Sequence, residues 1–136
     1  MSIRAIPLLL FVFLGYNIIV LVGGGDDPNA ILRYEVIKFP MLNNSIWSMT
    51  TGDLIVFALL VLLFLELLKA TYTSSTSLID HGLSMLVFVI CLIEFLLVRQ
   101  AQTSVFFFIV VASLIDVIAG YTIGIRVARR DFSIGS

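Results

Sequence analysis

The stretch "VFFFIVVASLIDVIAGYTIGI", residues 105–125, decides the class to which this chain belongs. It contains one charged residue, Asp116. A helix needs about 20 mostly apolar residues to cross a hydrocarbon core that is about 30 Å thick. Residues 105–125 therefore predict a transmembrane helix, with Asp116 about halfway along it.

Three more runs have the same character, at about residues 5–22, 54–70 and 82–98. Hydrophobic residues make up 60% of the 136 residues and charged residues 12%, whereas soluble domains average about 45–50% and about 25%. These runs predict an all-α integral membrane bundle of four transmembrane helices, forming a single domain over residues 1–136. Arg4 before the first run is a feature of signal peptides, but this run is longer than their usual apolar region. We therefore interpret it as a retained helix.

A long connection, residues 23–51, joins the first two runs and is predicted to lie on the outer face. Glycines at 23–25 and the following Asp-Asp-Pro end the first helix. In "AILRYEVIKF", residues 30–39, the helical spacing of Ile31, Tyr34 and Lys38 fits a short helix on the membrane surface. An extended strand over Tyr34–Ile37 fits nearly as well. Most connections of this size are plain surface loops, and a docking surface for a partner is the other interpretation.

Basic residues set the predicted orientation. With four spans, both termini and the 71–81 connection lie on one side, where five basic residues outnumber the three opposite. Positive charge favours the cytoplasmic side, so both termini are predicted to be cytoplasmic. The five are Arg4, Lys69, Arg126, Arg129 and Arg130, and the three are Arg33, Lys38 and Arg99.

Two short motifs predict helix starts. Thr50 with Asp53, and Ser77 with Asp80, have the spacing of a capping box, in which a hydroxyl and an acid three residues later satisfy unpaired backbone N–H groups. The first "SLID", residues 77–80, is thus predicted to start the third helix. His81 beside it is then an interfacial residue.

The second "SLID", residues 113–116, needs a different explanation because it lies inside an apolar run. A charged Asp116 facing lipid would cost about 2.5–3.5 kcal/mol, so we expect it to face the bundle and meet a polar group of another helix. Asn17 and the Cys91/Glu94 face are the first candidates. Ser113, Asp116, Gly120 and Gly124 share one helix face, and the last two form a small-xxx-small element for close helix approach.

Polar residues of the other runs lie at comparable depths, so we predict an inward polar seam. One interpretation is interhelical hydrogen bonding that fixes the packing, and another is a proton or cation path. A third is a ligand pocket lined by the phenylalanines of "VFFFIV". The predicted seam comprises Asn17, Glu66, His81, Ser84, Cys91, Glu94, Ser113 and Asp116.

The composition argues against enzymatic chemistry. Cys91 is the only cysteine and His81 the only histidine, which leaves no intrachain disulfide, cysteine cluster or pair of axial haem ligands. A net charge of −1 gives no basic field for nucleic acid. No phosphate-binding glycine loop, catalytic triad or HExxH motif is present. We expect no enzyme activity, no cofactor and no metal site.

Residues 76–98, "TSLIDHGLSMLVFVICLIEFLLV", together with "SLIDVIAGYTI" and "RVARRD", resemble a group of small four-span proteobacterial inner-membrane proteins that has no assigned activity. The resemblance covers roughly Gly52 to Asp131 and implies location and topology only. Small multidrug transporters also have four spans, but their essential glutamate lies in the first helix, where this chain has only Asn17.

The sequence thus predicts a non-enzymatic accessory or scaffolding subunit of a larger bacterial membrane assembly. Its expected partners are the lipid bilayer and either other membrane subunits or further copies of the chain. The alternative is a small oligomeric proton or cation conduit that uses Glu94 and Asp116.

Overall fold

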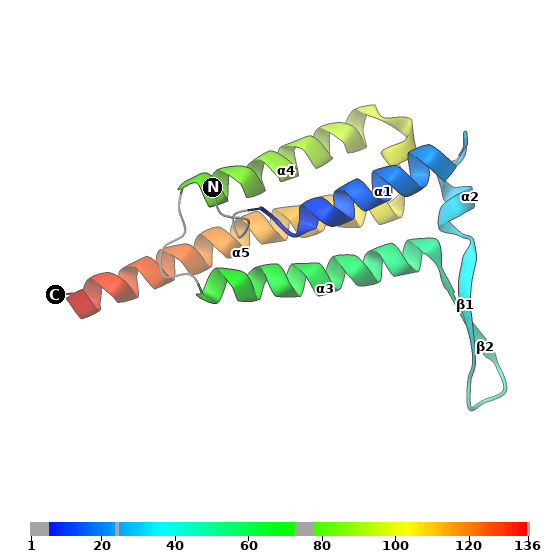
Figure 1. Cartoon of the computed structure of the whole chain (residues 1–136), viewed down its shortest axis with the longest axis horizontal. Helices are drawn as coiled ribbons and strands as arrows, with labels where there is room; N and C mark the ends of the chain where they lie inside the picture. Colours follow the sequence, from blue (N-terminus) through cyan, green and yellow to red (C-terminus); the bar gives the residue numbers. More distant parts are fainter. Residues whose placement is uncertain (1–5, 24, 73–77, 136) are drawn as a thin grey trace.

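The computed structural model describes residues 6–23, 25–72 and 78–135, and these are mostly helical with one small β-hairpin (Figure 1). The elements are α1 (Leu9–Gly23), α2 (Pro28–Leu32), β1 (Glu35–Pro40), β2 (Ile46–Thr50), α3 (Thr51–Tyr72), α4 (Leu78–Leu97), the 3-10 turn η2 (Arg99–Ala101) and α5 (Ser104–Gly135).

The long helices α1, α3, α4 and α5 lie side by side, and α5 packs most extensively against α3 and α4 (Figure 1). Within the described residues, two segments are long and apolar enough to cross a membrane, Thr51–Thr71 in α3 and Ser104–Ile123 in α5. The apolar helices Leu9–Gly23 and His81–Leu97 are shorter. The four predicted helical regions are therefore present, but only α3 and α5 reach spanning length on their own.

The helix boundaries differ from those of the predicted spans, and we describe the start of α1 and the end of α5. Helix α1 begins at Leu9, after Pro7, and its first turn is closed by hydrogen bonds from Leu10 N to Pro7 O (3.1 Å) and from Phe11 N to Leu8 O (3.1 Å). Helix α5 continues to Gly135, because its polar end contains no proline to stop it. Its 32 residues correspond to about 48 Å at 1.5 Å per residue. The apolar pattern predicted the membrane-length segment of α5, but it did not predict where this helix ends.

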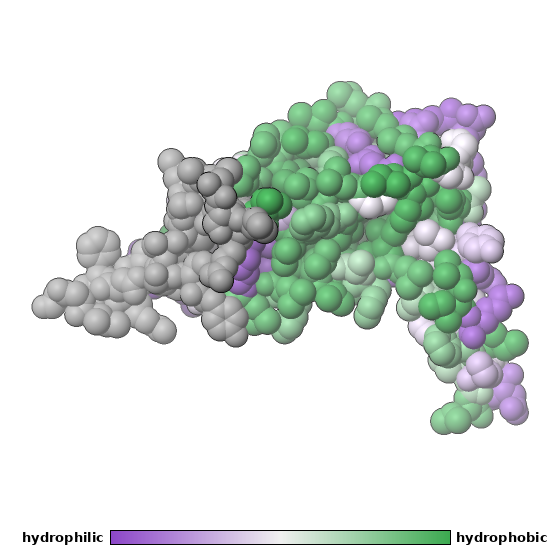
Figure 2. All heavy atoms as spheres, in the orientation of Figure 1, coloured by the Kyte–Doolittle hydropathy of each residue, from purple (hydrophilic) through white to green (hydrophobic). Residues whose placement is uncertain are grey.

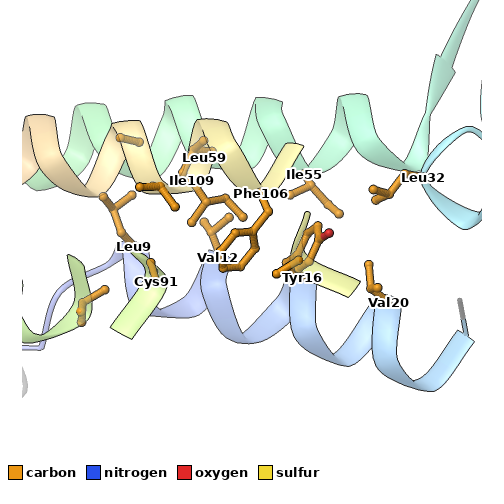
Figure 3. Packing of buried hydrophobic residues seen from close by; sticks show 14 residues of the cluster. Leu9, Val12, Tyr16, Val20, Leu32, Ile55, Leu59, Cys91, Phe106 and Ile109 are labelled. Atoms are coloured by element: carbon orange, nitrogen blue, oxygen red, sulfur yellow. The ribbon is translucent and has the colours of Figure 1, made fainter. Parts of the chain in front are cut away.

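A single cluster of buried residues joins the helices (Figure 3). Phe106 of α5 lies at its centre, with its ring 5.0 Å from that of Tyr16 in α1 and 6.4 Å from that of Phe95 in α4. Leu59 of α3 and Cys91 of α4 are also fully buried. Each long helix therefore contributes side chains to the same core.

The outer surface of the helices is apolar as well (Figure 2). Phe57 and Phe64 of α3 and Ile18 of α1 are each about 60% exposed, at 59%, 60% and 63%. Large exposed apolar patches mark contact with membrane or protein. The bundle therefore has an apolar interior and apolar sides.

Of the two interpretations of residues 30–39, the strand is the one that most of the stretch adopts, and a helix forms only at its start. Helix α2 covers only Pro28–Leu32 and is capped by Asp27, whose Oδ1 accepts from Asn29 N at 3.0 Å. Glu35–Pro40 instead pairs antiparallel with Ile46–Thr50. These segments are rich in β-branched and aromatic residues, which favour strands. Asn44, at φ 68°, takes the left-handed conformation in the turn.

The start of α3 is built as the capping motif predicts. Thr50 N donates to Asp53 Oδ2 (3.0 Å), and Asp53 N donates to Thr50 Oγ1 (3.1 Å). Gly52 between them is buried, and a Cβ there would lie 3.0 Å from Val105 Cγ2 and 3.1 Å from Leu32 O. This end of α3 is therefore closely packed against α2 and α5.

Candidate functional site

The polar side chains between the helices form separate local contacts instead of one continuous seam. We name two of them. The Glu66 cluster consists of Glu66, Lys69, Ser84 and Asp116, and the Tyr16 network consists of Tyr16, Gln100 and Thr103.

The Glu66 cluster ties the start of α1 to the end of α3. Glu66 is 6% exposed; its Oε2 accepts from Leu8 N at 3.0 Å, and its Oε1 lies 3.3 Å from Lys69 Nζ. Lys69 Nζ also donates to Ile6 O at 3.1 Å. The first N–H groups of a helix have no partner within the helix, and a carboxylate is favoured beside them. Glu66 therefore acts as a cap for a helix that lies far from it in sequence.

Asp116 completes this cluster from α5. It is 6% exposed and forms a side-chain hydrogen bond with Ser84 of α4, and it is close enough to Glu66 and Lys69 to interact with their charges. Asp116 thus faces inward as expected, but its partner is Ser84 and not Asn17 or the Cys91/Glu94 face. The polar residues were expected at comparable depths on the premise that the helix ends are level. In Figure 1 the helix ends are staggered, so other residues meet.

Asn17 and Glu94 instead meet each other, from α1 and α4. The Asn17 side chain hydrogen-bonds the Glu94 carboxyl and also donates from Nδ2 to Phe13 O at 3.0 Å. Glu94 Oε2 is buried and has no hydrogen-bond partner among the described residues. Buried polar atoms of this kind are uncommon and call for an explanation. Among the described acidic residues, Glu94 is the one that has a buried side-chain oxygen without a hydrogen-bond partner.

The Tyr16 network joins α1 to the start of α5 through neutral groups. Phe106 N donates to Thr103 Oγ1 (3.2 Å), and Thr103 Oγ1 lies 2.7 Å from Tyr16 Oη. Tyr16 Oη donates to Gln100 O at 2.8 Å. Because a carbonyl only accepts, the tyrosine proton points to Gln100 and the Thr103 hydroxyl donates to Tyr16. Each hydroxyl in the network is therefore satisfied.

The Tyr16 network was not predicted. Thr103 before "SVFFF" is a possible N-cap by residue type, which is the only signal the sequence offers for it. Nothing in the local pattern pairs Thr103 with a tyrosine 87 positions away. Glu66 as a cap of α1 was likewise hidden, because caps are normally sought next to the helix that they close.

The remaining residues of the predicted seam have local roles. The His81 ring makes an edge contact with the Tyr121 ring at 5.2 Å, between α4 and α5. Ser113 donates to Val110 O of its own helix at 2.7 Å. Cys91 is fully buried in the core.

The predicted close approach at Gly120 is absent, because a Cβ at Gly120 would meet no atom within 4 Å. Gly124 lies one turn further along α5, and its surroundings are outside the description. Of the second predicted cap, Ser77 lies outside the described residues. Asp80 is the third residue of α4, and its side chain is not described.

The phenylalanines of "VFFFIV" do not line a common pocket. Phe106 is fully buried, while Phe107 and Phe108 are each 47% exposed. Consecutive helix positions point about 100° apart, so a run of three divides between the core and the outer surface.

Among the described residues, no group of three or more His, Cys, Asp or Glu side chains could hold a metal ion. No family model, curated protein or solved structure matches the chain. Chemically, the arrangement can link helices through hydrogen bonds and an ion pair.

Proposed function

We propose that this chain is a four-span protein of the bacterial inner membrane that works, without catalysing a reaction, as an accessory or scaffolding subunit of a larger membrane assembly. Both termini lie in the cytoplasm. The observation that carries the proposal is the use of Glu66 and Asp116, two buried acids among the described residues, in contacts that hold one helix to another.

The apolar sides of the bundle support the membrane part of this proposal. Helices α1 and α4 are shorter than α3 and α5, yet they too expose large apolar side chains, among them Phe11 (57%) and Leu96 (61%). Leaving apolar surface in water costs about 25 cal/mol per Å². With α3 and α5 beside them, α1 and α4 lie in the same apolar layer, covered by lipid or by neighbouring subunits.

The fixed packing supports the scaffolding part. A transporter needs groups that alternate between partners, whereas Glu66 is bound on both oxygens, by Leu8 N and by Lys69. Contacts of this kind specify how helices pack in a membrane. The open side of α5 at Gly120 leaves room for a helix from another subunit.

Purification in mild detergent, with identification of co-purifying subunits, tests the proposal. We expect other membrane proteins to be retained at fixed stoichiometry, and a Gly120→Leu variant to retain less of them while Gly15→Leu retains them fully. A Cβ at either glycine would meet no atom within 4 Å, so the two substitutions should disturb the fold of the chain equally little. Recovery of the chain alone, with no retained partner, would contradict the assignment.

Cysteine accessibility tests the orientation. In a Cys91→Ser background, Asn44→Cys in the hairpin turn is expected to react with a membrane-impermeant reagent from outside the cell. Ser2→Cys and Ser136→Cys are expected to react only after the membrane is opened. Labelling of Asn44→Cys only from the cytoplasmic side would reverse the topology.

A proton or cation conduit is the second candidate, and the unpartnered Oε2 of Glu94 is the observation that favours it. In reconstituted vesicles, a conduit predicts ion flux that Glu94→Gln or Asp116→Asn abolishes while assembly stays intact. A structural role predicts no flux and tolerance of both changes. Asp116→Leu then weakens assembly by about 1 kcal/mol, the scale of one interhelical hydrogen bond in a membrane.

A further inference from the structure

The β-hairpin has one face that is wholly apolar. In the register Phe39 faces Trp47 and Ile37 faces Met49. Directly paired residues, and residues two apart on a strand, share one face of a sheet. The apolar face therefore consists of Ile37, Phe39, Trp47 and Met49.

Phe39 and Trp47, the outer pair of this face, are exposed, while Ile37 and Met49 are half-buried. The Phe39 and Trp47 rings stack with centroids 6.0 Å apart, and the two residues are still 50% and 44% exposed. A two-stranded hairpin in water is marginally stable at best unless its apolar face packs on something. The stacked pair thus needs a cover that the chain itself does not provide among the described residues.

The opposite face is mixed: Pro40 faces Ile46 near the turn, and polar residues follow toward the base. Lys38 faces Ser48 there, and Lys38 Nζ lies 3.4 Å from Glu35 Oε2. The two charges of this exposed pair cancel, so the pair is compatible with water and presents no net charge to a partner. In Figure 2 hydrophilic residues gather mostly along the outer edge of the hairpin.

The hairpin is joined rigidly to a membrane-length helix. Strand β2 ends at Thr50 and α3 begins at Thr51 with no linker, and Thr51 N donates to Tyr34 O at 2.9 Å, which closes the base of the hairpin. Figure 1 shows the hairpin leaving the end of α3 and running crosswise to the helices. If α3 crosses a bilayer, the hairpin must extend along the bilayer surface.

We propose that the apolar face of the hairpin lies on the outer surface of the bilayer and inserts Trp47 and Phe39 at the level of the lipid headgroups. This inference rests on the proposed membrane function. The Trp47 indole, with an apolar ring system and a polar N–H group, is favoured at that depth, and Phe39 stacks beside it. The outward-facing N–H and C=O groups of two edge strands need water or headgroups, so the hairpin stays shallow.

Trp47 is the only tryptophan of the chain, so its fluorescence reports on this face alone. The purified full-length chain is reconstituted into phosphatidylcholine vesicles whose acyl chains carry bromine either near the headgroup or near the chain end. We expect shallow bromines to quench Trp47 at least about twofold more strongly than deep ones, because interfacial aromatics lie near the headgroups. Aqueous iodide should quench it weakly.

A depth reference separates this inference from the membrane assignment. The variant Trp47→Phe/Leu60→Trp moves the single tryptophan to a 59% exposed position of α3, nine residues after Thr51 and about 14 Å along the helix. Deep bromines should quench that variant best. If they do, while Trp47 responds only to iodide, the hairpin inference fails and the membrane assignment stands. If neither tryptophan responds to bromolipids, both fail.

Matched variants test the face itself. Met49→Asp places a charge on the apolar face and should cut bromolipid quenching of Trp47 and raise iodide quenching, whereas Ser48→Asp on the opposite face should change neither. Equal effects of the two variants would overturn the inference. Protection of wild-type Trp47 from both iodide and bromolipids would also overturn it, since a second copy of the chain would then be the cover.

Discussion

At both ends of the helical bundle, side chains supply hydrogen-bond partners to backbone groups, but the chemistry of those side chains differs. Where α1 begins, the Glu66 cluster satisfies backbone groups with a carboxylate and an ammonium group. Where α5 begins, the Tyr16 network does so with two neutral hydroxyls. A charged pair leaves an uncompensated charge when one member is removed, whereas a neutral network loses only hydrogen bonds. The first end should therefore be the more sensitive to substitution.

Packing differs between the same two regions. At the start of α3, Gly52 lies against the Leu32 carbonyl and the Val105 side chain, while Gly120, in the second half of α5, has no neighbour within 4 Å. The end with neutral hydrogen bonds is thus held by close packing. The other end relies on polar contacts and leaves one side of α5 open.

The largest expected effect is that of Glu66→Ala. It leaves Lys69 without its carboxylate and Leu8 N without its acceptor, so we expect a loss of about 3 kcal/mol, the lower range for breaking a buried ion pair. Unfolding by denaturing detergent in mixed micelles, followed by circular dichroism, measures it. Glu66→Gln keeps an acceptor for Leu8 N and should lose less.

The control for this prediction is Glu35→Ala, which breaks the exposed pair with Lys38 in the hairpin. An exposed pair contributes about 0–1 kcal/mol. Similar losses in Glu66→Ala and Glu35→Ala would show that the Glu66 cluster is not a buried link between α1 and α3.

Gly52→Ala should cost about 1–2 kcal/mol, because its Cβ would overpack a backbone carbonyl that has little freedom to move. Gly120→Ala should be neutral or slightly stabilising in the same unfolding experiment, since alanine favours a helix interior over glycine by up to about 1 kcal/mol. Equal losses of unfolding free energy at Gly52 and Gly120 would contradict the inferred difference in packing between the two ends. A Gly120→Ala variant that folds normally but loses a partner would instead place Gly120 at a subunit interface.

Tyr16→Phe should cost about 1 kcal/mol, the usual net value of a lost hydrogen bond, while its ring keeps the contact with Phe106. Thr103→Val removes the α5 cap and the same bond to Tyr16. A double-mutant cycle should give a coupling of about 0.5 kcal/mol or more, as for residues in one network. Additive losses would mean that the two hydroxyls act independently.

The smallest effect is expected for Ser84→Ala, which removes the hydrogen bond from α4 to Asp116. The loss should be about 0.6 kcal/mol, the average for such bonds in a membrane protein. Ser113→Ala is its match, because the Ser113 hydroxyl bonds only to its own helix and its loss should not loosen α4 from α5. A larger loss at Ser113 than at Ser84 would argue against the α4–α5 link.

Local patterns predicted the local features well. Thr50 and Asp53 form the expected capping box because that motif depends on residues three positions apart. The helical regions followed from runs of apolar residues. The sequence left residues 30–39 open between helix and strand because the two patterns overlap in a short apolar stretch, and pairing with residues 46–50 decided for the strand.

Sequence by itself determined the number and type of the long helices, their apolar character, and the inward placement of Asp116, because each follows from the periodicity of residues along one segment and from the cost of placing a carboxylate in lipid. Only the tertiary structure decided that Asp116 meets Ser84, that Asn17 meets Glu94 and that Glu66 caps α1. Those pairs depend on the stagger and rotation of whole helices. A shift of one residue turns a helix by about 100° and advances it by 1.5 Å, which is enough to exchange one polar partner for another.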